Sequence, residues 1–147
     1  MKPKKIIWHH SANSSTPPQI ASVEAHHRSL GFAKSLLGNH TGYHYFIERD
    51  GTIWQARVDS EIGAHDAGEN EGSIGVCLAG NFDYKWPSRE QHDAAGRLVA
   101  SLLIKWNLGL ADIEPHRVGD STSCPGKNLP DKWLAYATIN FQAGYLN

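Results

Sequence analysis

The chain has 147 residues, of which 40% are hydrophobic and 20% are charged, and its formal net charge is −1. This composition is typical of a folded protein, here one domain over residues 1–147, and excludes collagen and long disordered segments. No apolar run approaches the ~20 residues of a membrane-spanning helix, and no basic stripe indicates nucleic acid binding. We therefore expect a monomer that neither enters a membrane nor binds nucleic acid.

Cysteine and histidine usage narrows the class further. Cys77 and Cys124 are too few for a disulfide framework. The N-terminal apolar run 6–8 is too short for the core of a signal peptide, so we expect cytoplasmic synthesis unless a leader is missing. Nine histidines are the unusual feature, because imidazole is the commonest metal ligand and general base.

The first half of the chain predicts three strands and one helix. Residues 5–9 are bulky and apolar, which is typical of a strand buried on both faces. Residues 18–30 carry apolar side chains at helical spacing. Residues 43–48 and 53–57 flank the turn signal Asp50-Gly51, and this pattern predicts a hairpin.

The second half predicts two more strands and two helices. Residues 73–79 and 112–115 are the strands, and residues 130–139 form the last helix. Between them, Ser88 and Gln91 form a capping box at the start of a helix. That helix has one apolar face, made of Ala95, Leu98, Val99, Leu102, Leu103 and Trp106. The order predicts an α/β single domain with a central mixed β-sheet flanked by helices.

A candidate metal site follows from four residues near strand ends. His9 and His10 end the first strand, His116 follows the last strand, and Cys124 lies in the loop beyond it. Two histidines and one cysteine are an allowed ligand set for catalytic zinc, which keeps a fourth position open. These residues do not form a local motif, so unrelated loop histidines and an inert cysteine remain an alternative at this point.

Six short motifs in a fixed order carry a family resemblance. They are His9-His10-Ser11-Ala12, Gly42-Tyr43-His44-Tyr45-Phe46-Ile47, Arg49-Asp50-Gly51-Thr52, Gly63-Ala64-His65, Asn70-x-x-Ser73-Ile74-Gly75-Val76, and His116-Arg117 with Ser123-Cys124-Pro125-Gly126. With them the chain resembles the zinc-dependent N-acetylmuramoyl-L-alanine amidases of type 2, a superfamily that includes phage lysozyme-type endolysins and peptidoglycan recognition proteins. The similarity covers about residues 5–136 and implies a zinc site at the strand ends.

The resemblance implies a role for each matching residue. His9, His116 and Cys124 correspond to the ligands of one zinc ion (Zn2+) per chain, and Tyr43 corresponds to the catalytic tyrosine. Thr122 stands where phage-type members often carry lysine and amidase-active recognition proteins carry threonine. The implied reaction is hydrolysis of the amide between the lactyl group of N-acetylmuramic acid and L-alanine, in peptidoglycan or a muramyl peptide.

Other polar residues of the motifs are weighed against structural roles. The resemblance implies substrate contact for His65, with a solvated loop histidine as the alternative. Asn70 lies in the same loop and is a second candidate for substrate contact, with a turn role as the alternative. His10 and His44 follow site residues along strands, so we expect them to point to the opposite side. Cys77, inside an apolar strand, is interpreted as an inert buried thiol.

Three alternatives to a wall-lytic amidase remain. One is a recognition module without catalysis, although the ligand residues and Tyr43 are present. Another is a cysteine peptidase using Cys124 and His116, which Pro125 disfavours because it supplies no amide to lower the thiol pKa. The third is a cytoplasmic recycling amidase for soluble anhydromuropeptides, where the family tends to carry aspartate in place of cysteine. The sequence favours a compact endolysin of a phage or prophage that acts on the cell wall after its release.

Overall fold

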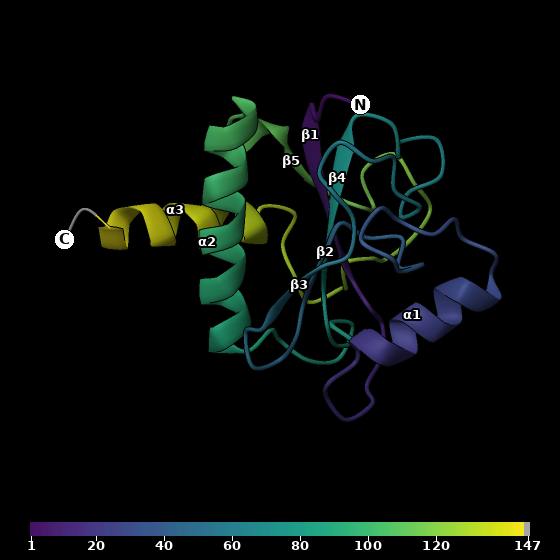
Figure 1. Cartoon of the computed structure of the whole chain (residues 1–147). Coiled ribbons are helices and arrows are strands. Elements are labelled where there is room, and N and C mark those ends of the chain that lie inside the picture. Colours follow the sequence, from purple (N-terminus) through teal and green to yellow (C-terminus); the bar gives the residue numbers. More distant parts are fainter. Residues whose placement is uncertain (146–147) are drawn as a thin grey trace.

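The computed structural model describes residues 1–145 as a mixed five-stranded β-sheet with helices on both faces (Figure 1). The strand order is β3-β2-β4-β1-β5. Strand β1 runs parallel to β4 and β5, β2 runs parallel to β4, and only β3 is antiparallel to its neighbour in this sheet of the described chain. The predicted α/β class with a mixed sheet is confirmed.

The central strands are the longest. β1 spans Lys5–His10 and β4 spans Ser73–Leu78, and almost every residue of both is buried. Their continuous apolar runs suit parallel strands that are covered on both faces. The register pairs Trp8 with Val76 and His9 with Cys77, so β1 ends beside the end of β4.

The outer strands are shorter than the sequence predicts. β2 spans Tyr45–Ile47, β3 spans Ile53–Gln55 and β5 spans Ile113–Pro115. The predicted hairpin is confirmed, with Gly51 at φ 87° in its turn, a conformation that glycine adopts without strain. Its ladder ends early because the carbonyl of His44 accepts hydrogen bonds from both Ala56 and Arg57.

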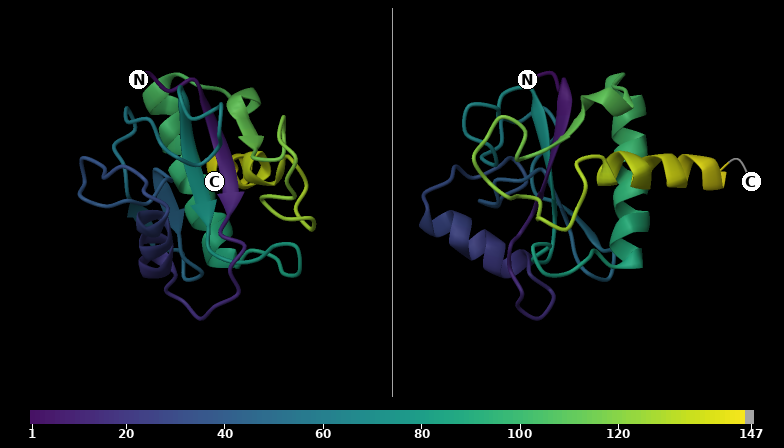
Figure 2. Two further views of the ribbon diagram at one scale, coloured as in Figure 1. Left: turned by 90° about the vertical axis from the view of Figure 1, so that its right-hand side faces the viewer. Right: turned by 180° about the vertical axis from the view of Figure 1, so that it is seen from behind.

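Three α-helices in residues 1–145 complete the fold. α2 (Arg89–Trp106) and α3 (Trp133–Tyr145) cross on one side of the sheet, and α1 (Ile20–Ser29) lies on the other side (Figure 2). The predicted capping box is present at the start of α2. α1 begins two residues later than predicted, and α3 begins at Trp133 and runs further toward the C-terminus. None of the helices in this part of the chain has the length and apolar character to cross a membrane.

Side-chain alternation along β1 decides what lies on each face. Ile6 and Trp8 join the main core beneath α2 and α3, a cluster that also contains Val99 and Leu134. His9 directly follows Trp8 in the strand and therefore faces the opposite side, that of α1. The sheet thus buries most of its apolar surface on one side and presents His9 on the other.

Candidate metal centre

Three side chains from distant segments converge on the α1 side of the sheet. Nδ1 of His9 lies 3.2 Å from Nδ1 of His116 and 3.8 Å from Sγ of Cys124. The ligand atoms of all three residues lie within 4.8 Å of one another. His9 is buried, whereas His116 and Cys124 are partly exposed, so the cluster is accessible from one side.

Backbone and guanidinium contacts hold the loop that carries Cys124. The His116 amide donates to the carbonyl of Trp8 (3.1 Å), and the Arg117 amide donates to the carbonyl of Cys124 (2.9 Å). The Arg117 guanidinium also donates to the carbonyls of Ser123 (3.2 Å) and Gly126 (2.9 Å). These contacts fix Cys124 relative to the end of β1 although the loop has no regular structure.

The donor set and its spacing fit a zinc ion. Zinc binds imidazole nitrogen at about 2.0–2.1 Å and thiolate sulfur at about 2.3 Å in a tetrahedron, which puts ligand atoms about 3.3–3.6 Å apart. The separations of 3.2 and 3.8 Å lie close to that range. Burial lowers the pKa of His9 well below its ordinary value, and the neighbouring His65 and His116 lower it further. The His9 ring is therefore neutral, as a metal ligand must be.

Each candidate histidine ligand has a partner on its other ring nitrogen. Nε2 of His116 lies 3.0 Å from a carboxylate oxygen of Asp120 and 3.5 Å from one of Asp66. Nε2 of His9 lies 3.0 Å from Nδ1 of His65. Neither Asp66 nor Asp120 was predicted from the sequence. Two features of the sequence could have indicated them: Asp120 follows His116 by four residues, and Asp66 directly follows His65.

Tyr43 lies beside the cluster, as the resemblance implies. Its ring centroid is 5.2 Å from that of His9 and 5.4 Å from that of His27 on α1. Burial raises the pKa of Tyr43 well above its ordinary value, and the nearby Cys77 and Cys124 raise it further. The hydroxyl therefore stays protonated and can donate a hydrogen bond. Tyr43 also lines a hollow of about 290 Å³ together with Ser11, Asn13, Ser22, Val23, His26 and His27.

Thr122 lies in the loop that carries Cys124. Its hydroxyl oxygen accepts a hydrogen bond from the Cys124 amide at 3.1 Å. The side chain is partly exposed, and its hydroxyl proton remains available to a further acceptor. Thr122 thus lies within two residues of a candidate ligand and couples to it through the backbone.

His65 and Asn70 make contacts within the protein. His65 is 9% exposed, and its two ring nitrogens face His9 and Ser73. The side-chain oxygen of Asn70 accepts from the amides of His65 (2.8 Å) and Asp66 (2.9 Å). These contacts give both residues a structural part beside the metal centre, and their substrate contact stays a prediction.

The two histidines that follow site residues differ in position. His10 points away from the cluster, as strand alternation predicts, but the same expectation for His44 is wrong: its ring lies beside that of His65, with 5.8 Å between centroids, because β2 begins only at Tyr45 and alternation does not extend back to Tyr43. Nδ1 of His10 accepts from the amide of Phe82 at 3.0 Å, on the other side of β1. Nδ1 of His44 accepts from the amide of Gly75 (3.0 Å), and its Nε2 donates to the carbonyl of Glu61 (2.7 Å). Both rings therefore serve the fold.

The state of Cys124 bears on the cysteine peptidase alternative. Burial raises the pKa of Cys124 to about 12, although a hydrogen bond from the backbone of His10 and the charge of Arg117 act in the other direction. A nucleophilic cysteine requires a lowered pKa. The thiol is therefore poorly suited to attack a peptide bond by itself, whereas a metal ion would deprotonate it on binding.

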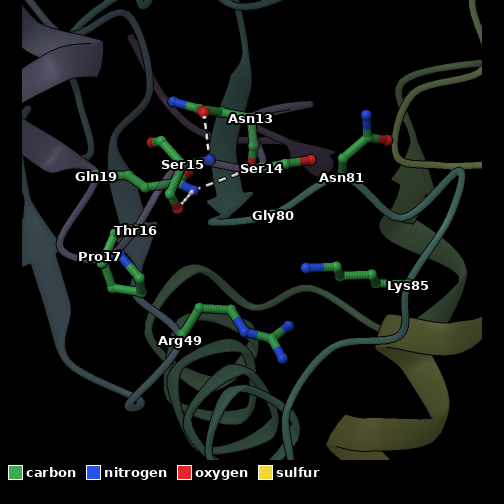
Figure 3. A pocket seen from close by; sticks show the side chains of 10 residues that line it. All are labelled: Asn13, Ser14, Ser15, Thr16, Pro17, Gln19, Arg49, Gly80, Asn81 and Lys85. Carbon is green, nitrogen blue, oxygen red and sulfur yellow. Dashed lines mark hydrogen bonds between the residues drawn. The ribbon is translucent and has the colours of Figure 1, made fainter.

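A second hollow of about 290 Å³ lies away from the three candidate ligands. Its lining comes from the loop after β1, from Arg49, and from the loop after β4. Figure 3 shows the side chains of Arg49 and Lys85 directed into this space, with Asn13, Ser14 and Asn81 around it. The two hollows share Asn13.

Comparison with known proteins decides the family. The model of the family described as N-acetylmuramoyl-L-alanine amidase matches residues 1–127. The chain belongs to this amidase family. The resemblance inferred from the six motifs is thereby confirmed.

Relatives of this amidase-family chain include phage endolysins and animal recognition proteins. The endolysin of Klebsiella phage KP32 is 30% identical over 134 residues, covering 88% of this chain and 84% of the relative. The endolysin of Escherichia phage T7 is 33% identical over 97 residues, or 63% of each protein. Peptidoglycan-recognition protein SD of Drosophila melanogaster is 34% identical over 89 residues, or 60% of this chain and 48% of the relative. The match thus spans less than two thirds of the last two relatives.

Solved structures of the amidase family share the fold. N-acetylmuramoyl-L-alanine amidase LysC from Clostridium intestinale URNW superposes with a TM-score of 0.78 at 27% identity, covering 96% of this chain and 86% of that one. Drosophila PGRP-LB superposes with a TM-score of 0.73 at 30% identity, covering 88% and 78%. A point mutant of PGRP-LB, with phenylalanine in place of a tyrosine, has been solved in complex with tracheal cytotoxin.

Proposed function

We propose that the chain is a zinc-dependent amidase that cleaves peptidoglycan between the lactyl group of N-acetylmuramic acid and L-alanine. The observation that carries the proposal is the convergence of His9, His116 and Cys124 beside Tyr43 in a member of this family. We place its action at the cell wall, after release from the cell that makes it, because phage endolysins are among its relatives.

One zinc ion per chain would be held by His9, His116 and Cys124. Bound there, zinc supplies Lewis-acid polarisation of a carbonyl and lowers the pKa of water at its open position. The protein's own part is to deliver two neutral imidazoles and a thiolate from rigid segments. The Arg117 contacts to the loop serve that purpose, since they hold Cys124 in reach of His9.

Tyr43 and Thr122 are the residues that would act on the substrate. Tyr43 keeps its proton, so it donates a hydrogen bond to the carbonyl oxygen as that oxygen gains negative charge. Thr122 has a free hydroxyl proton and can donate to the same oxygen. A preorganised donor of this kind contributes about 3–4 kcal/mol to the stabilisation of a transition state. Thr122 supplies no charge, unlike the lysine of many phage-type members.

The hollow lined by Tyr43 is the proposed place of the muramyl peptide. It lies between the loop after β1 and helix α1, and Asn13, His26 and His27 offer polar groups along it. Its open side suits a polymer, which cannot enter a closed cavity. The binding of tracheal cytotoxin by PGRP-LB supports a muropeptide as the ligand class.

The deciding experiment is digestion of purified peptidoglycan, with and without a zinc chelator, followed by mass analysis of the products. The proposal expects free stem peptides beginning with L-alanine, which disappear with chelator and return with added zinc. Cleavage that is indifferent to the chelator would contradict the zinc mechanism and restore Cys124 as a nucleophile.

The same digest addresses the other two functions. Binding to the wall without any product would support the recognition module, which has relatives such as recognition protein SD. Soluble anhydromuropeptides, tested in parallel with intact sacculi, address the recycling amidase. Faster cleavage of the soluble substrate than of the wall would support that alternative over a lytic enzyme.

A further inference from the structure

A line of three hydrogen bonds runs from His9 into the protein interior. Nε2 of His9 lies 3.0 Å from Nδ1 of His65, and Nε2 of His65 lies 3.2 Å from the hydroxyl oxygen of Ser73. The Ser73 hydroxyl then lies 2.6 Å from the backbone carbonyl of Glu69. His65 and Ser73 are both buried.

The end of this line fixes the direction of every proton in it. A carbonyl oxygen only accepts, so at 2.6 Å the single hydroxyl proton of Ser73 goes to Glu69. Ser73 must then accept from Nε2–H of His65, which leaves Nδ1 of His65 without a proton. That nitrogen accepts from Nε2–H of His9. The lone pair of His9 is therefore on Nδ1, the atom that faces His116 and Cys124.

We propose that His65 and Ser73 form a neutral relay that fixes the tautomer and ring orientation of His9 for metal binding. In this role both are positioning residues, because they act on the metal through His9. The inference rests on the metal centre of the proposed function but does not depend on which bond the enzyme cleaves.

The surrounding backbone is shaped to hold the His65 ring. A Cβ atom at Gly75 would lie 2.6 Å from that ring, and one at Gly63 would lie 2.8 Å from it. Both distances are too short for ordinary contact, so glycine at these positions makes room for the imidazole. Asn70 holds the turn that carries His65, because its side-chain oxygen accepts hydrogen bonds from the amides of His65 and Asp66.

The second imidazole ligand is supported in a different way. Nε2 of His116 faces the carboxylates of Asp120 and Asp66, which carry negative charge. The partner of His9 is a neutral ring that leads to a carbonyl. The relay therefore orients His9 without adding charge to the metal centre. The negatively charged partners contact the other imidazole ligand, His116. Loss of such an outer partner typically weakens metal affinity 10- to 100-fold.

The first test reads the tautomers directly by nitrogen–proton NMR of the metal-free protein. We expect both His9 and His65 as Nε2–H tautomers in the native chain. In a Ser73→Ala variant we expect His65 to lose its single form and His9 to show a mixture. A native His9 with its proton on Nδ1 would overturn the proposal.

The second test measures the zinc dissociation constant by competition with a chromophoric chelator. Ser73→Ala should weaken zinc binding 10- to 100-fold, and Ser73→Thr, which keeps a hydroxyl, should lose less. The matched control is Ser35→Ala, since Ser35 is also buried and donates to a backbone carbonyl (Ala56, 2.7 Å) away from the metal centre. Equal zinc affinity in Ser73→Ala and Ser35→Ala would overturn the relay.

A His65→Gln variant completes the design, with His44→Gln as the matched buried histidine. His44 contacts the His65 ring edge-on at 5.8 Å between centroids, but its nitrogens bond only backbone groups in the described chain. We expect weakened zinc affinity in His65→Gln alone. If the native protein binds zinc with the expected tautomers but cleaves no wall, the proposed function fails and the relay stands.

Discussion

Nδ1 of His9 and Nδ1 of His116 lie 3.2 Å apart, although 107 positions separate the two residues in the chain. When the neighbours of both rings accept protons from Nε2, two lone pairs face each other at this distance beside the Cys124 sulfur. Such lone pairs repel unless a cation or a proton lies between them. A metal ion bound between the two nitrogens would remove this repulsion.

Zinc should accordingly stabilise the folded chain. A ligand that binds only the native state at 1,000 times its Kd adds about 4 kcal/mol to the free energy of unfolding. We expect zinc to raise the Tm of the native protein and to have little effect on Cys124→Ser. Cys77→Ala is the control, since Cys77 is buried in β4 outside the ligand set. A full zinc response in Cys124→Ser would contradict the ligand assignment.

Removal of the Tyr43 hydroxyl should slow catalysis without loss of metal. Tyr43→Phe keeps the ring that packs near His9 and His27 but removes a hydrogen-bond donor. We expect kcat to fall about 100- to 1,000-fold, as for loss of one oxyanion donor. Zinc content, measured by metal analysis, should not change. Tyr84→Phe serves as the control because this tyrosine is 80% exposed, and a normal rate in Tyr43→Phe would refute the donor role.

Thr122 separates a hydroxyl requirement from a charge requirement. Thr122→Ser keeps the oxygen that accepts from the Cys124 amide, and Thr122→Val removes it at nearly constant volume. We expect Thr122→Ser to retain most of its activity. We expect kcat of Thr122→Val to fall about 100-fold, because one hydrogen-bond donor to the developing oxyanion is lost. Steady-state kinetics with equal zinc loading checks this. Similar losses in both variants would indicate that Thr122 matters for packing only.

The sequence predicted the elements that depend on local pattern. The apolar runs of β1 and β4, the Asp50-Gly51 turn and the capping box of Ser88 are all short-range signals, and each is present. The start of α1 was less predictable. The amides of Gln19 and Ile20 donate to the carboxylate of Glu48, a residue that follows β2, so a contact across the fold sets this boundary.

The site shows the same division between local and long-range information. Motifs placed His9, His116, Cys124 and Tyr43 in one cluster, because each lies in a short stretch typical of the family. Ser73 and Asp66 were not assigned. Ser73 contacts His65 and Asp66 faces His116, and both contacts depend on how the loop before β4 packs beside β1, which no local pattern encodes.

The crossing of α2 and α3 depends on a glycine. A Cβ atom at Gly96 would lie 2.3 Å from the carbonyl oxygen of Ala137. Gly96→Ala should therefore lower the free energy of unfolding by about 1–3 kcal/mol, the usual cost of overpacking. Gly144→Ala is the matched control, since nothing lies within 4 Å of a Cβ there and alanine should add about 0.5–1 kcal/mol in a helix. Urea unfolding of both variants tests this, and a stable Gly96→Ala would contradict the close approach.

Asp59 should make stability depend on acid pH. Its burial alone would raise its pKa, but hydrogen bonds from Tyr45, Lys105 and Trp106 outweigh burial and lower the pKa. Because the folded pKa lies below the unfolded value of about 3.9, the stabilisation is complete above that value. It is lost as pH falls through the folded pKa.

Replacement of the Asp59 carboxylate tests whether its negative charge stabilises the folded protein. We expect Asp59→Asn to lower the free energy of unfolding by about 1–3 kcal/mol at pH 7, since it leaves a buried charged network with weaker acceptors. The difference between the native and variant curves should begin to shrink as pH falls below the unfolded value of about 3.9 and should be lost once pH passes the folded pKa, because the native carboxylate is then protonated as well. Urea unfolding at several pH values provides the measurement, with Asp93→Asn on the exposed face of α2 as the control. A difference between the native protein and Asp59→Asn that stays constant down to pH 3 would show that geometry, and not charge, accounts for the contribution of Asp59.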